Sequence, residues 1–109
     1  MLLVLTKNNV EGFHAWGNAV KEVEFLRDRH RHIFNIYCQF EVNHEDRQIE
    51  IFMQEREIEK YLHNKYGKPC EFGNMSCEAI AQEILCKFNA HEVKVLEDEG
   101  GGAIVRREY

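Results

Sequence analysis

The stretch that decides the fold is IFNIYCQFEVN, at residues 33–43. Its even-numbered positions, from Phe34 to Val42, are all apolar, and its odd-numbered positions from Asn35 onward carry polar groups. Strict alternation over this length is typical of a half-buried strand in an antiparallel sheet. His30 and His32 lie just before the stretch and continue its even-numbered face.

Two helices are predicted downstream of this strand. After a polar turn at residues 43–47, apolar residues recur at helical spacing within residues 52–66, and Gly67 and Pro69 end that pattern. Ser76 is a suitable N-cap for the second helix. The buried stripe of this second helix is predicted to consist of Ile80, Ala81, Ile84, Leu85 and Phe88.

Three further strands complete the prediction. The apolar residues 1–5 are expected to open a first long strand, and two more strands are expected at about 91–97 and 103–107. The glycines at 100–102 separate the last two strands, as a hairpin turn would. The order strand, strand, helix, helix, strand, strand predicts one α+β domain over residues 1–109. We expect an antiparallel sheet with both helices on one face.

Amino-acid composition and net charge limit the classes of function and partner that the chain is expected to have. The chain has 109 residues, of which 44% are hydrophobic and 30% charged, and this is a globular composition. A net charge of −5 without a Lys/Arg stripe argues against nucleic acid as a partner. The apolar start is too short to span a bilayer and does not look like a secretory leader, so no membrane partner is expected. The four cysteines form no Cys-x-x-Cys pair, and we interpret them as reduced thiols of a cytoplasmic protein.

His30-Arg31-His32 is the main chemical signal. On a strand both imidazoles point to one face, about 6–7 Å apart along the chain, which suits two ligands of one metal ion. An antiparallel partner strand that ends near His14 would bring a third imidazole alongside. Three neutral imidazoles leave one open position on a tetrahedral zinc ion, and an open position is typical of a ligand or substrate site. The alternative is that the pair is accidental among the six histidines of a purely structural domain.

Several short motifs follow one another along the chain: Gly12-Phe13-His14, His30-Arg31-His32-Ile33-Phe34, Glu50-Ile51-Phe52, Met75-Ser76-Cys77-Glu78-Ala79 and Val93-Lys94-Val95-Leu96-Glu97. In order and spacing they resemble the motifs of the tetrahydropterin-synthase family. That family includes 6-pyruvoyl-tetrahydropterin synthase and the bacterial 6-carboxy-tetrahydropterin synthase of the deazaguanine pathway. Its motifs are a Phe and a His on the first strand, a His-Gly-His segment that opens the second, an Asp-Phe segment that enters the first helix, a Pro-Thr-x-Glu-Asn start of the second helix, and a Glu that ends the third strand.

The resemblance implies the T-fold, in which subunits close their sheets into a barrel as a homo-oligomer, here a hexamer or a tetramer. It implies zinc as the cofactor, held by His14, His30 and His32. It also implies a pocket in which Glu97 binds a pterin or a guanine-like ring. A carboxylate suits this role because it can accept paired hydrogen bonds from a ring N–H and the neighbouring amino group.

Two functions follow from the resemblance. The first is a zinc-dependent lyase-like enzyme that acts on a pterin or purine-derived compound similar to dihydroneopterin triphosphate. The second is a non-catalytic zinc-containing protein of the same fold that binds a pterin or a nucleotide. Leu26 stands where the family has its catalytic Cys, and Leu cannot serve as a base or a nucleophile.

The residue that transfers protons is not identified from the sequence. Cys38 falls on the apolar face of the decisive strand, and Cys77 falls in the first turn of the second helix. We interpret both thiols as structural. The possible proton carriers, among which the sequence does not select, are Asp28, His44, His63 and His91.

Overall fold

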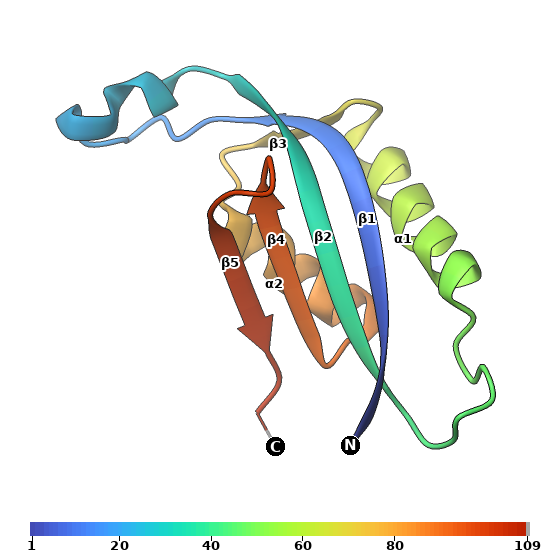
Figure 1. Cartoon of the computed structure of the whole chain (residues 1–109). Helices are drawn as coiled ribbons and strands as arrows, with labels where there is room; N and C mark the ends of the chain where they lie inside the picture. The colour runs from blue at the N-terminus through green and yellow to red at the C-terminus, as the bar shows by residue number, and fades with distance from the viewer. Residues whose placement is uncertain (109) are drawn as a thin grey trace.

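Two long strands form the centre of the computed structural model, which describes residues 1–108. Strand β1 (Leu2–His14) pairs antiparallel with β2 (His30–Val42) (Figure 1). The register runs from Leu2 opposite Val42 to His14 opposite His30. The even-numbered side chains of β2 are buried from position 34 to position 42. The predicted half-buried strand is therefore confirmed.

The last two strands form the predicted hairpin. Strand β4 (Glu92–Glu97) pairs antiparallel with β2 and with β5 (Gly102–Arg106). The first residue of β5 has to be glycine, because a Cβ atom on Gly102 would lie 1.8 Å from the Val95 carbonyl oxygen. The close approach of these two backbones fixes where β4 ends, and therefore where Glu97 lies.

A fifth strand, β3 (Cys70–Gly73), corrects the expectation of a purely antiparallel sheet. It pairs parallel with the end of β1, so the sheet is mixed and has the order β3-β1-β2-β4-β5. Four residues are too few for a periodic signal, and a parallel pairing depends on a partner far away in the sequence. Its side chains nevertheless alternate as those of a strand should, with Cys70 and Phe72 buried.

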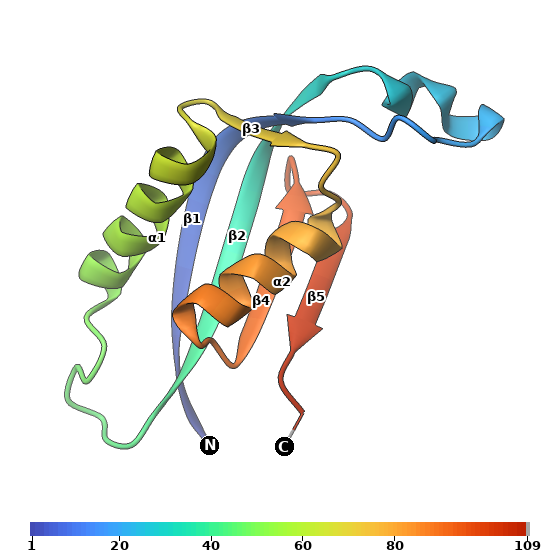
Figure 2. The same ribbon diagram turned by 180° about the vertical axis from the view of Figure 1, so that it is seen from behind.

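The two α-helices pack on one face of the sheet, as predicted (Figures 1 and 2). Helix α1 (Ile51–Tyr66) is capped by the Glu50 carboxylate, which accepts hydrogen bonds from two backbone N–H groups of the first turn. Helix α2 (Cys77–Phe88) is capped by the Ser76 hydroxyl, which accepts from the backbone N–H of Ala79. Within the described chain, none of the helices combines the length and the apolarity that crossing a membrane requires.

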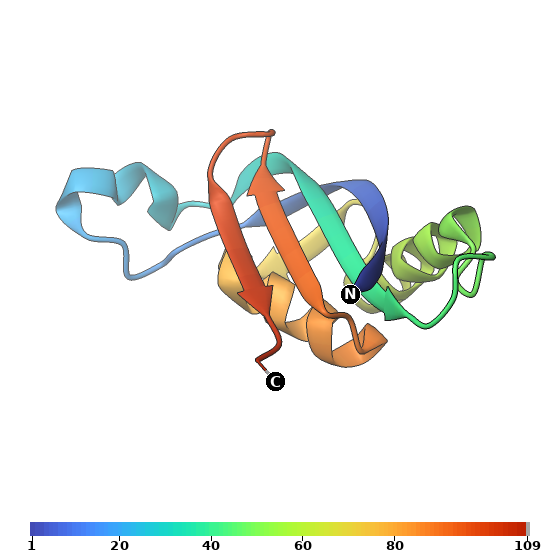
Figure 3. The same cartoon turned by 60° about the horizontal axis from the view of Figure 1, so that its bottom comes forward.

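The segment between β1 and β2 extends beyond the end of the sheet (Figures 1 and 3). It contains a 3₁₀ helix, η1 (Lys21–Arg27), which the sequence pattern did not predict. The Leu26 carbonyl accepts a hydrogen bond of 2.8 Å from the backbone N–H of Trp16, which ties the two arms of the segment together. The side chains of Trp16 and Phe25 are exposed. Over residues 1–108 the fold is α+β, with a five-stranded mixed sheet, two α-helices and one 3₁₀ helix.

Candidate metal centre

The three predicted histidines meet where β1 ends and β2 begins. His14 and His30 lie directly opposite each other in the strand pairing, and His32 lies two residues further along the same face. One ring nitrogen from each histidine lies within 4.8 Å of the other two. The ring of Phe34 packs edge-on beneath the group, 5.2 Å from the centre of His14 and 5.6 Å from that of His32. The group can hold a metal ion.

Each histidine is oriented through its Nδ1 atom. An oxygen lies opposite each Nδ1: the Met75 carbonyl at 2.9 Å from His14, the Asp28 carbonyl at 2.8 Å from His30, and the Asp98 carboxylate at 2.7 Å from His32. Carbonyl and carboxylate oxygens only accept hydrogen bonds, so the ring Nδ1–H donates in all three contacts. In a neutral ring the lone pair is then on Nε2, the arrangement usual for metal-binding histidines.

The Nε2 atoms of His14 and His32 are buried and have no hydrogen-bond partner among residues 1–108. The residue His14 is only 9% exposed, so water has little access to form a hydrogen bond with its ring. Buried polar atoms without partners are rare in folded proteins, and each one needs a physical explanation. Three converging imidazoles with outer oxygen acceptors match the nitrogen ligands and the supporting shell of a metal site built from histidines.

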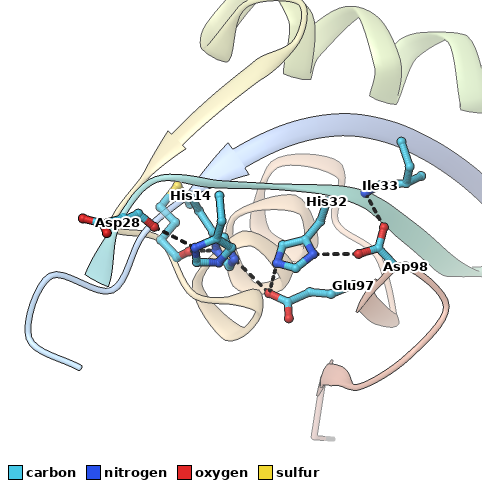
Figure 4. A network of polar contacts seen from close by, with 8 residues as sticks. His14, Asp28, His32, Ile33, Glu97 and Asp98 are labelled. Carbon is cyan, nitrogen blue, oxygen red and sulfur yellow. Dashed lines mark hydrogen bonds and ion pairs between the residues drawn. The ribbon is translucent and has the colours of Figure 1, made fainter. Parts of the chain in front are cut away.

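Glu97, the last residue of β4, reaches the same point. Its Oε2 atom lies 2.9 Å from Nε2 of His14 and 3.6 Å from Nε2 of His32 (Figure 4). The shorter distance is that of an ion pair, but the atoms lack the angle of a hydrogen bond, since this Nε2 is left without a hydrogen-bond partner in the described chain. The residue that the resemblance assigns to ring binding is therefore in direct contact with the histidines.

A cavity of about 460 Å³ opens beside the histidines. His14, His30 and Glu97 line one part of it, and Trp16 and Leu26 from the protruding segment line another. Its volume falls in the range of small-molecule sites, which combine apolar walls with a few polar groups. Leu26 adds an apolar side chain to this wall and no acid or base.

Cys77 also lines this cavity. Burial, followed by the charge of the nearby Glu97 carboxylate, raises the pKa of the Cys77 thiol to about 12. Burial likewise raises the pKa of Cys38, on the sheet face beneath the helices, to about 12. Both groups are protonated thiols at neutral pH, which agrees with their interpretation as structural residues.

The sequence did not point to Asp98, which shapes the site from the β4–β5 turn. Its backbone is left-handed, with φ 51°, a conformation that Asp tolerates better than most residues. Its carboxylate accepts from the backbone N–H of Ile33 at 2.8 Å and from the His32 ring. The hydrogen bond from Ile33, followed by that from His32, holds the pKa of Asp98 below its usual value. Its position directly after Glu97 was the only available signal.

The candidate proton carriers are scattered. Asp28 contributes its backbone carbonyl to the site. The described residues that line this cavity do not include His44, His63 or His91. His63 instead lies on α1, where its Nδ1 is 3.8 Å from the Glu59 carboxylate. These three histidines are therefore poorly placed for chemistry in the cavity.

Replacing Asp98 by alanine is expected to weaken metal binding by about 10- to 100-fold, because His32 loses the acceptor that fixes its ring. Competition with a chromogenic chelator measures this change. Glu99→Ala is the matched control: Glu99 lies in the same turn but contacts Lys7 and Tyr37 instead of a histidine. Equal metal affinities for the two variants would contradict the supporting role of Asp98.

Comparison of the chain with protein-family models found no match, and comparison with curated proteins found no significant match. The geometry therefore defines the chain as an α+β protein in which three histidines can hold a metal ion. Membership of the tetrahydropterin-synthase family stays a prediction from the motifs.

Proposed function

We propose that the chain is a zinc-dependent, lyase-like enzyme of the tetrahydropterin-synthase type that acts on a pterin or purine-derived compound. The observation that carries the proposal is the convergence of one ring nitrogen from each of three histidines, beside a cavity that His14, His30 and the Glu97 carboxylate line. The T-fold belongs to the same proposal and is supported by the two strand pairs and by the helices on one face.

The residues have separate roles in this proposal. His14, His30 and His32 hold the zinc, and Glu97 accepts hydrogen bonds from the amino-pyrimidinone edge of the ring. Trp16 and Leu26 offer apolar contact to the ring and exclude water from it. Zinc, when bound, supplies a Lewis acid that polarises an oxygen-bearing substituent and acidifies a neighbouring proton.

Two observations favour a second candidate function, a non-catalytic protein that binds a pterin or a nucleotide. Leu26 lies in the cavity wall, and the pKa of the Cys77 thiol on the same cavity is raised to about 12. Neither side chain is able to transfer a proton readily near neutral pH.

Incubating zinc-loaded protein with dihydroneopterin triphosphate distinguishes the two functions. An enzyme converts the compound, as followed by chromatography with fluorescence detection, and zinc-free protein does not. Tight binding without conversion supports the second function. Absence of both binding and conversion would contradict the ring pocket as a whole.

We also propose that the chain assembles into a closed homo-oligomer, a hexamer or a tetramer. The edge strands β3 and β5 each pair on only one side within residues 1–108, and natural proteins cover or pair such edges. Trp16 and Phe25 add exposed apolar surface on the protruding segment. Light scattering at micromolar concentration is expected to give a mass several times that of one chain. A monomer would count against both the barrel and the T-fold.

A further inference from the structure

The Glu97 carboxylate lies at the distances from the histidine nitrogens that a further ligand of the same metal would have. In a tetrahedral site with metal–ligand bonds of about 2.0–2.1 Å, any two ligand atoms lie roughly 3.3–3.4 Å apart. The Oε2 atom of Glu97 lies 2.9 Å from Nε2 of His14 and 3.6 Å from Nε2 of His32. The two distances bracket the tetrahedral edge, and the same oxygen makes both approaches.

The close approach of Glu97 Oε2 to the Nε2 atoms of His14 and His32 requires a positive charge. With each Nδ1–H donating outward, the neutral Nε2 atoms of His14 and His32 carry lone pairs, and they lie close to the Glu97 carboxylate. A neutral ring nitrogen and a carboxylate oxygen 2.9 Å apart repel each other unless a cation is bound beside both or the ring is protonated. A protonated His14 would make a charged hydrogen bond with good alignment, but Nε2 has no hydrogen-bond partner in the described structure. The geometry favours a shared cation.

We infer that Glu97 is the fourth protein ligand of the metal when the cavity is empty. Three imidazoles and one carboxylate then complete a tetrahedral site, so the open position expected from three histidines is filled by the chain itself. This inference rests on the metal site of the proposed function and goes beyond it. A ring that pairs with Glu97 has to draw the carboxylate away from the metal. Ring binding is therefore coupled to the opening of the fourth coordination position on the metal.

The test uses the full chain loaded with zinc or with cobalt(II), whose visible spectrum reports coordination. Glu97→Gln is compared with wild type and with Glu78→Gln, a control that removes an exposed carboxylate from the same cavity. We expect zinc to bind at least 10-fold more weakly to Glu97→Gln than to the other two proteins. We also expect azide to change the cobalt spectrum only in Glu97→Gln, where the fourth position is no longer held by the chain.

The outcomes are distinguishable. Equal zinc affinities in the three proteins, or the same azide affinity for wild-type and Glu97→Gln cobalt protein, overturns the inference and leaves the three-histidine site intact. A chain that binds neither zinc nor cobalt overturns the proposed metal site together with the inference. Circular dichroism of the metal-free variants shows that each is folded. Glu97 has a side chain that is 33% exposed, and the isosteric amide is expected to be tolerated there.

Discussion

Replacing His30 by alanine is expected to remove zinc binding at micromolar concentration. The variant loses one of three nitrogen ligands, a larger change than the loss of an outer partner, which alone costs about 10- to 100-fold in affinity. The loss should also appear in stability, because a metal at about 1,000 times its dissociation constant stabilises the folded state by about 4 kcal/mol. Zinc should therefore raise the melting temperature of wild type by more than about 10 °C and leave His30→Ala unchanged.

His44→Ala is the control for this experiment, since His44 is an exposed histidine in the loop before α1. It should bind zinc as wild type does. If zinc stabilises His30→Ala and wild type equally, the metal is bound somewhere else and the assignment of the three histidines is wrong.

Replacing Glu97 by glutamine is expected to weaken ring binding by about 2–4 kcal/mol, because a charged acceptor is lost and a ring N–H is left without its partner. Calorimetric titration of neopterin, biopterin and plain pterin into zinc-saturated protein measures the effect. All three ligands should lose affinity, since all carry the same amino-pyrimidinone edge. Removing zinc should instead weaken only the binding of neopterin and biopterin, which carry oxygen-bearing side chains.

Glu78→Gln again serves as the control for a lost carboxylate on the cavity wall. Because Glu97 is proposed to cap the metal, saturating pterin should also make wild-type cobalt protein sensitive to azide. Unchanged affinity of Glu97→Gln for all three rings would show that the ring pocket implied by the resemblance is wrong. The metal site would be unaffected by that result.

The predictable part of the fold is the part with a local signal. The alternation from Phe34 to Val42 and the N-cap Ser76 each specify structure through neighbouring residues, and both are confirmed. Strand β3 (Cys70–Gly73) and the 3₁₀ helix η1 (Lys21–Arg27) were missed for the opposite reason. The first is short and pairs with a distant strand, and the second is interrupted by non-helical backbone at Val23.

The candidate site divides in the same way. The spacing of His30 and His32 shows that they share a face, and antiparallel pairing then brings His14 beside them. The atoms that orient the rings include the backbone carbonyls of Met75 and Asp28, and a carbonyl leaves no mark in the sequence because every residue has one. Contact between Glu97 and the histidines depends on the strand order, which a local pattern does not reveal.

The metal content of the purified protein tests the central proposal most directly. Elemental analysis of the wild-type chain, after removal of loosely bound ions, should find about one zinc per chain, as expected for one three-histidine site. Metal-free protein refolded with zinc should recover the same content. A folded protein that still binds no zinc after this treatment would contradict the proposed metal centre and every function built on it.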